Sequence, residues 1–585
     1  MSKIQFICKP GFTPAIDSGP HEFETLSSSE LRVEHDSIII VPAILDNNNA
    51  MSYDGVSLAI RAYLDFIQKG EDLFAIYILS SESKGSFYSH CDYADFLKCP
   101  NVHFLNNAKQ EIESTLKSAS LQPLRFSEAT EALNVVRIKA PSAYKTHHSI
   151  TNEWSIYRWS KYLELEDIKI SKEIEESLYF KYLSVIHDLQ VVGSTSVKPI
   201  FPQARVLLVD DEAEKGWKDF FFALFSKSPV TFEAIGQSDF AEKATEEIEN
   251  IVLSKVKEFN PDVIILDMRL EETDFEPKDA EKFTGVRILK RIKDEVNKGI
   301  QVIGFTASNK VWNYLEWSNS GHGIDDIVIK ESPEKSRDSS YTQTAISHLA
   351  ESILTGIERA VFLKKADDDL RKIRALIQET DIDDDFITES IHNTEVSYEL
   401  MREYNIDGKY LGYAYMQLFQ ILEKYMNLIT YWDGDYFVLK FGDRIYKILH
   451  REGNSNKCDC AMRNEGKGNF SFGKGEYDIS HNHVESNLTI SAAQIFLLGQ
   501  KKVSQDWIDV RFVRNKKVAH PVENGAVTKE DFKKLLSFLK KFFNKGSLHP
   551  RNGNDALAEL PKASPATNSL GDNPALASLI AKLNG

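Results

Sequence analysis

The chain has 585 residues, with 70 Lys+Arg against 87 Asp+Glu and a formal net charge of −17 at pH 7. This length predicts about three or four domains, and 42% apolar with 27% charged residues is typical of folded globular protein. Five cysteines are too few for a disulfide framework. No apolar run near the start reaches the ~20 residues of a membrane span, and no signal-peptide core opens the sequence. We therefore expect a cytoplasmic protein without a membrane partner.

Residues 1–120 alternate short apolar runs with helical patterns. Ile38–Val41 fits a strand buried on both faces, and residues 55–67 carry apolar side chains at helical spacing. This alternation predicts βαβ units around a parallel sheet. Pro42 stands at the end of the expected central strand.

Residues 121–200 are predicted to form a helical linker region. One helix in it carries the pair His147 and His148 followed by Trp154 and Trp159. A histidine pair can carry a phosphoryl group because imidazole is nucleophilic near neutral pH. No kinase-type signature surrounds this pair, so we favour a helix that packs its tryptophans on a neighbouring domain.

Residues 201–340 contain apolar runs that each end on polar side chains. Because the carboxyl ends of parallel strands share one edge of a sheet, these side chains should meet there. The runs are RVLLVDDE (205–212), VIILDMRL (263–270), QVIGFTAS (301–308) and DIVIK (326–330).

The side chains expected at this edge suit phosphoryl transfer. Asp210, Asp211 and Asp267 offer hard oxygen ligands for one Mg²⁺. Asp267 is the candidate nucleophile. Lys330 supplies a positive charge and Thr306 a hydroxyl, both able to bind phosphoryl oxygens.

Residues 204–333 resemble the receiver domain of bacterial response regulators, a doubly wound α/β fold with a parallel sheet. The resemblance implies Mg²⁺ as cofactor and a cognate histidine kinase or phosphotransfer protein as partner. The implied site residues are Asp267 as phosphoacceptor, Asp210, Asp211, Asp267 and the Arg269 carbonyl as metal ligands, and Thr306 and Lys330 as the switch pair.

Two features depart from that family's pattern. The loop Glu271–Thr284 is longer than usual and acidic, which predicts altered access for the phosphodonor. Ile327 stands where receivers usually carry a switch aromatic. The usual rotation of an aromatic ring is therefore not expected at this position.

Residues 1–120 resemble a degenerate receiver. The run IIIVPAIL (38–45) parallels VIILDMRL (263–270), and Pro42 then takes the place of Asp267. Such a domain would not accept phosphate there and would serve docking or dimerisation. An unrelated α/β domain is the equally weighted alternative, because short strand similarities recur by chance.

Residues 341–392 are predicted to form a helical connector. No proline occurs from 343 to 379, and apolar residues recur at helical spacing. The pattern indicates a rod that leads out of the preceding domain, with a coiled-coil dimer stalk as one interpretation.

Residues 393–546 are predicted to be an all-α bundle that ends in a basic segment. Residues 501–550 hold 12 Lys+Arg against 5 Asp+Glu, and RFVRNKKVAHP (511–521) places Arg514 and Asn515 ahead of His520. Arg binds phosphate bidentately and His moves a proton near pH 7. With no metal ligands beside them, RNA cleavage through the 2′-hydroxyl is the matching chemistry.

This segment resembles the HEPN superfamily, helical bundles with an R-x(4–6)-H motif that often act as RNases. The resemblance implies Arg514, Asn515 and His520 as catalytic residues, RNA as substrate and a homodimer as the assembly. Arg514 and His520 lie about 120° apart on a straight helix. They converge only if the helix is distorted or if two chains build the site. An inactive binding module is the alternative.

A zinc site and a mobile tail complete the predictions. Cys458, Cys460, His481 and His483 could hold zinc, but their spacings are tighter than those of zinc fingers, so this prediction is the weaker one. Residues 547–585, rich in Asn, Pro, Ala and Ser, are predicted to be a mobile tail. The whole sequence thus predicts a phosphorelay response regulator with an HEPN ribonuclease effector. The family resemblance implies that this protein acts in stress response or phage defence. A non-enzymatic signalling adaptor is the alternative.

Overall fold

The protein is described here from a computed structural model of the 585-residue chain. Its residues fall into two compact units, Met1–Asp367 and Asp368–Gly585. Apart from short internal gaps, the described residues are 3–7, 21–45, 52–140, 147–186, 198–271, 274, 282–307, 323–333, 336, 339–433, 436–449, 461–464, 470–473, 489–490, 493–494, 504–519 and 525–544.

A five-stranded sheet in the order β11-β10-β9-β7-β8 organises the middle of the first unit. All its neighbouring strands are parallel, so their carboxyl ends share one edge. The central strands are apolar and buried on both faces, as expected for a sheet covered by helices on each side. The strands are β7 (Ala204–Val209), β8 (Val230–Ile235), β9 (Val263–Leu266), β10 (Gln301–Thr306) and β11 (Asp326–Ile329).

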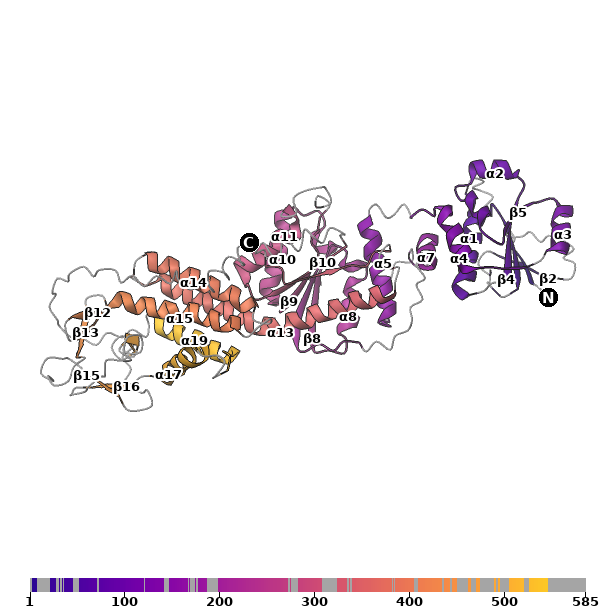
Figure 1. The fold of residues 1–585 in the computed structure, drawn as a ribbon. Coiled ribbons are helices and arrows are strands. Elements are labelled where there is room, and N and C mark those ends of the chain that lie inside the picture. The colour runs from indigo at the N-terminus through magenta and orange to yellow at the C-terminus, as the bar shows by residue number, and fades with distance from the viewer. Residues whose placement is uncertain are drawn as a thin grey trace. The chain divides into compact units, whose positions relative to one another are not determined.

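Helices cover both faces of this sheet (Figure 1). One apolar layer joins the sheet to α8 (Trp217–Phe225) and to the first half of α13 (Ser339–Gln378). The opposite layer contains α10 (Thr245–Phe259) and α11 (Thr284–Arg291). The prediction of a doubly wound parallel sheet for this part of the chain is confirmed at the level of its architecture.

The N-terminal sheet has the strand order β2-β1-β3-β4-β5, with the short β6 (Gln122–Pro123) antiparallel to β4. Its five principal strands are parallel and follow the same spatial order, numbered from the first strand of the domain, as those of the central sheet. These strands are β1 (Lys3–Ile7), β2 (Glu22–Leu26), β3 (Ser37–Pro42), β4 (Leu73–Ser80) and β5 (Val102–Asn106).

A glycine packs against the end of the middle strand in both sheets. In α1 (Asp54–Lys69), a Cβ on Gly55 would lie 1.8 Å from the carbonyl oxygen of Pro42. In α11, a Cβ on Gly285 would lie 2.4 Å from the carbonyl oxygen of Asp267. Pro42 and Asp267 therefore occupy matching places, each with a helix start pressed against its backbone.

We expect Gly55→Ala to destabilise the N-terminal domain by about 1–3 kcal/mol, because the added methyl group must displace backbone rather than a flexible side chain. Gly85→Ala in α2 (Lys84–His90) is the matched control. Nothing lies within 4 Å of its added Cβ, and alanine favours a helix over glycine by about 1 kcal/mol. Urea unfolding of both variants measures the difference. Equal stability of the two would contradict the close packing at Pro42.

The segment predicted as a linker, residues 121–200, divides between the two α/β domains. α4 (Phe126–Val136) and α7 (Leu178–Ile186) contribute Leu133 and Val185 to the N-terminal core. Between them, α5 (His147–Tyr162) packs Trp159 into the core of the central domain. The described helices of this segment therefore pack into the cores of the domains that flank them in sequence.

The predicted connector also contributes to the core of the central domain. α13 runs for 40 residues; Ile346 and Ile353 pack in the central domain, while Leu370 and Ile377 are buried further along. The boundary predicted at 340 falls inside α13, and the one at 392 falls inside α14 (Asp384–Arg402). The apolar face of α13 is already buried within the chain, which argues against a free coiled-coil seam.

The second unit is a helical assembly with a β insertion. α14, α15 (Lys409–Ile429), α17 (Gln505–Phe512) and α19 (Lys529–Phe543) supply its helices. Trp507 stacks near both Phe419 and Phe538, tying three of these helices together. An all-α domain was predicted, but β12 (Thr430–Asp433), β13 (Tyr436–Phe441) and β14 (Arg444–Leu449) form an antiparallel sheet after α15. None of the described helices is both long and apolar enough to cross a membrane.

Candidate functional site

Three carboxylates meet at the carboxyl edge of the central sheet. Asp210 and Asp211 follow β7, and Asp267 follows β9. One oxygen atom from each can be chosen so that all three lie within 4.8 Å of one another. The local sequence explains this placement, because β7 and β9 are hydrogen-bonded neighbours in register and end side by side. We call these residues the acidic cluster.

Lys330 joins two members of the acidic cluster. Its Nζ lies 2.8 Å from Asp210 Oδ2 and 2.8 Å from Asp267 Oδ2. All three side chains are fully buried. Burial alone would lower the pKa of Lys330, but the two carboxylates outweigh it and raise that pKa. Lys330 is therefore a firmly charged ammonium held between two acids.

The acids carry more negative charge than Lys330 balances. Burial raises the pKa of Asp211 to about 9, reinforced by the charges of Asp210 and Asp267. Burial likewise raises the pKa of Asp210 to about 6, even though Lys330 opposes the shift. Such crowding of carboxylates is what a divalent cation relieves.

A further observation, an oxygen of Asp211 without a hydrogen-bond donor among the described residues, indicates that these residues suit Mg²⁺. Asp211 Oδ1 is buried, yet it makes no hydrogen bond with any residue that the structure describes. A buried carboxylate oxygen without a donor is suited to metal coordination. Bound there, Mg²⁺ would reduce the repulsion between the acids and an incoming phosphoryl group. The backbone N–H of Arg269 donates to Asp267 Oδ1 over 3.0 Å and so helps to orient this carboxylate.

Thr306 and Ile327 lie on the strands beside the acidic cluster. Thr306 ends β10 and is buried, one strand away from Asp267. Ile327 on β11 is partly buried against the apolar layer that contains α11. Thr306 thus ends the strand next to the one that Asp267 follows, and its role as the switch hydroxyl stays a prediction.

The long acidic loop begins with a tightly bonded segment that the sequence did not reveal. Asp274 is buried and accepts hydrogen bonds from the backbone N–H groups of Leu270, Glu271 and Thr284. Burial raises the pKa of Asp274, although these bonds oppose the shift. Asp274 therefore closes the start of the loop onto the start of α11.

Asp326, at the start of the strand that leads to Lys330, pairs with His348 of α13 at 3.3 Å. The hydrogen bond to Asp326 raises the pKa of His348. Burial would raise the pKa of Asp326, but bonds from His348 and Ser352 lower it. The pair should stabilise the fold most between about pH 4 and 6.5, above the unfolded pKa of Asp and below that of His.

We expect His348→Gln to lower the free energy of unfolding by less than about 1 kcal/mol near pH 5.5, because the pair is half-exposed. The raised histidine pKa means that this contribution disappears as pH rises through it, so the variant and the wild type should converge near pH 8.5, roughly two units above the unfolded value. Urea unfolding at the two pH values measures this change. If the free energy of unfolding of the variant fell further below that of wild type as pH rises, the ion pair would be contradicted.

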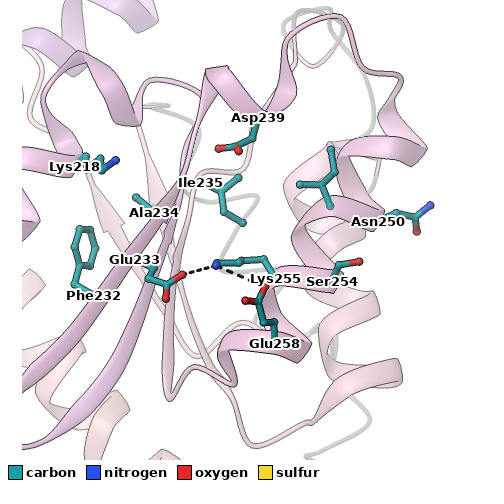
Figure 2. Close-up of a pocket in the computed structure, with 11 residues that line it drawn as sticks. Lys218, Phe232, Glu233, Ala234, Ile235, Asp239, Asn250, Ser254, Lys255 and Glu258 are labelled. Atoms are coloured by element: carbon teal, nitrogen blue, oxygen red, sulfur yellow. Dashed lines mark ion pairs between the residues drawn. The ribbon is translucent and has the colours of Figure 1, made fainter.

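A pocket of about 680 Å³ lies elsewhere, along the edge strand β8 and α10 (Figure 2). Lys255 spans it, 2.5 Å from Glu233 and 3.8 Å from Glu258. No member of the acidic cluster lines this pocket. The candidate phosphoryl-transfer site is therefore separate from it.

Arg514 lies in a widened turn of the second unit. Residues Val513–Val518 form a π-helix that continues α17, and the N–H of Ala519 bonds to the Arg514 carbonyl five residues back over 3.3 Å. π-helical turns frequently mark functional sites. The helix is thus distorted at Arg514 rather than straight. His520 lies outside the described residues.

The Arg514 side chain is held by Glu423 and Phe419 of α15 and by the neighbouring Asn515. Its guanidinium donates to Glu423 over 3.2 Å and to Asn515 Oδ1 over 3.1 Å, and it lies 5.6 Å from the centre of the Phe419 ring. Sequence reasoning missed Glu423, because no local pattern connects residues 91 positions apart. The structure therefore brings together Arg514 and Asn515, with Glu423 as an added acidic partner.

The basic segment is partly neutralised within its own unit. Several of its lysines pair with acids on the same or neighbouring helices, so the local excess of positive charge overstates what is available to a polyanion. Cys458, Cys460, His481 and His483 lie outside the described residues, as does the tail 547–585. The lysine pairs are Lys517–Asp531, Lys534–Asp509, Lys540–Asp369 and Lys541–Asp506.

Comparison with known proteins adds little to this chemistry. No protein-family model matches the chain, and no curated protein matches it. Among solved structures, NtrX from Brucella abortus, crystallised in complex with ADP, is 14% identical with a TM-score of 0.18. The match covers 33% of this chain and 40% of NtrX. The chain thus spans less than half of that protein, and the function has to be argued from the site itself.

Proposed function

We propose that the protein is a response regulator that accepts a phosphoryl group on Asp267. The observation that supports this most is the bridging of Asp210 and Asp267 by Lys330 at 2.8 Å on each side. A fully buried lysine between two acids, beside a third acid with an uncommitted oxygen, is costly to keep for stability alone. Perturbed, crowded groups of this kind are typical of reactive sites.

The proposed reaction uses side chains from this edge of the sheet together with a phosphodonor and Mg²⁺. A carboxylate oxygen of Asp267 attacks the phosphorus of the donor, the new P–O bond forms, and the bond from phosphorus to the donor's leaving group breaks. The Lys330 ammonium then pairs with the negatively charged phosphoryl group and binds one of its oxygens. The Thr306 hydroxyl donates a hydrogen bond to another phosphoryl oxygen. Asp210, Asp211 and the Arg269 carbonyl would hold Mg²⁺. A histidine kinase or phosphotransfer protein is the proposed physiological donor.

The test is phosphoryl uptake by the full-length protein. Incubation with acetyl phosphate and Mg²⁺ should add the mass of one phosphoryl group, and chelation of the metal should prevent the addition. Intact-mass spectrometry measures both. A wild-type protein that takes up no phosphoryl group would remove the proposal.

We further propose that the second unit is a metal-independent HEPN ribonuclease effector that acts as a homodimer. The specific support is the π-helical turn that carries Arg514 and the clamp on its guanidinium by Glu423 and Asn515. Such a clamp would orient an arginine toward phosphate. The rival is a binding module without cleavage, in which Arg514 serves only the ion pair. RNA degradation by purified protein, with and without acetyl phosphate, separates the two.

A further inference from the structure

The helix α5 contacts the candidate phosphorylation site although it precedes the central domain in sequence. It is buried nearly all round between Thr151 and Ser160. One side, marked by Ser149, Asn152 and Trp159, meets the central domain. Trp154, on another side, stacks against Phe180 of α7 and donates its Nε1–H to Ser336 of the central domain over 2.7 Å. Glu153, Tyr157 and Lys161 mark the more exposed remainder.

The first route from the site to α5 passes through Glu331, the residue after Lys330. Its carboxylate is fully buried and accepts the Trp159 Nε1–H over 3.0 Å. Its carbonyl oxygen lies 2.8 Å from Ser155 Oγ, and Arg158 lies 3.6 Å from its carboxylate. Glu331 is therefore bonded to α5 through both its side chain and its backbone.

The second route passes through the acids. The backbone N–H of Glu212 donates to Asp210 Oδ1 over 2.8 Å, and the Glu212 carboxylate accepts from Ser149 Oγ over 3.4 Å. α5 thus contacts Glu212, two residues after Asp210, and Glu331, the residue after Lys330.

The third route passes through an aromatic ring. Lys330 Nζ lies 5.4 Å from the centre of the Trp217 ring, and the Trp217 Nε1–H donates to Asn152 Oδ1 over 3.1 Å. Trp217 also packs edge-on against Trp159. A displacement of Lys330 would therefore change the surroundings of a tryptophan that α5 holds in place.

We propose that α5 is the output helix of the site: it is docked while Lys330 bridges Asp210 and Asp267, and phosphorylation of Asp267 weakens its docking. This inference rests on the proposed phosphoryl transfer and names its regulation. Phosphorylation draws Lys330 away from Asp210, so the adjoining Glu331 and Trp217 lose the positions that match α5. Buried hydrogen bonds are costly to leave unsatisfied, which makes docking sensitive to such small shifts.

Hydrogen exchange in the full-length protein tests this coupling. With acetyl phosphate and Mg²⁺, the backbone amides of residues 150–160 should exchange at least about fivefold faster, the lower end of typical coupling between sites. Asp267→Asn should show no acceleration under the same conditions. Intact mass, measured in parallel, reports phosphoryl uptake. Uptake with unchanged or slower exchange in α5 would overturn the coupling alone, whereas absence of uptake would overturn the proposed function as well.

Linkage supplies a reciprocal test. Trp159→Phe keeps an aromatic ring but removes the donor to Glu331, and Ser155→Ala removes a second contact. If phosphorylation weakens docking, weakened docking lowers the free energy of the phosphorylated state relative to the unphosphorylated one. We therefore expect both variants to reach a higher phosphorylated fraction than wild type at limiting acetyl phosphate. Lys161→Gln, on the exposed side of α5 where the lysine contacts Tyr157, should match wild type. A phosphorylated fraction equal to or lower than that of wild type in both variants would overturn the proposal.

Discussion

Asp267→Asn should abolish Mg²⁺-dependent uptake of a phosphoryl group, because the amide removes the nucleophilic oxygen while keeping the shape of the side chain. The full-length variant should show no added mass with acetyl phosphate, whereas wild type gains one phosphoryl group. The fold should survive, since Asp267 is bonded through its backbone N–H to the Val209 carbonyl over 2.8 Å whatever its side chain. Far-UV circular dichroism of the variant checks this.

Asp219→Asn is the matched control for that experiment. Asp219 is a partly buried acid in α8, outside the acidic cluster, so its replacement should leave uptake unchanged. The same measurement examines Pro42, which occupies the matching place in the N-terminal sheet and has no carboxylate. Residual labelling of Asp267→Asn that maps to residues 1–140 would contradict the prediction of a silent N-terminal domain. Equal labelling of wild type and Asp267→Asn would show that the acceptor is a different residue.

His520→Ala and Arg514→Ala should each abolish RNA cleavage, and cleavage by wild type should persist in EDTA. Loss of a general acid–base residue costs about 10²–10⁴-fold in rate, and Arg514 would supply the charge that stabilises the reacting phosphate. Initial rates on a labelled RNA measure both. Lys372→Gln, which removes an exposed cation on α13, is the control and should cleave like wild type.

Mixing two inactive variants tests whether one chain or two chains build this second site. If the Arg and His of one site come from different chains, mixing Arg514→Ala with His520→Ala should restore part of the activity; if both come from one chain, no activity returns. Cleavage that survives His520→Ala, or that stops on chelation, would contradict the metal-free mechanism. Either result would leave binding without cleavage as the proposed function of the second unit.

The acidic cluster could be predicted from the sequence because each acid is placed by its own strand. Asp210 and Asp267 each follow a short apolar strand, and parallel strands bring their carboxyl ends to one edge whatever the rest of the fold does. Lys330 obeys the same rule, so the residues predicted to meet do meet. The match of Gly55 with Gly285 is also visible in the sequence, where Asp54-Gly55-Val56 parallels Thr284-Gly285-Val286. The structure adds that each glycine starts a helix that packs against the end of a strand.

What depended on tertiary structure was the set of partners. The tryptophans of α5 predicted burial, but Trp159 and Glu331 are 172 positions apart, and no periodicity in one segment names a partner at that distance. The same holds for Glu423 and Arg514, and for α13, whose apolar spacing fits a free stalk as well as a helix packed into a domain core. Hydrophobic spacing determines which face of a helix is buried. The surface that buries it is chosen by the packing of the whole chain.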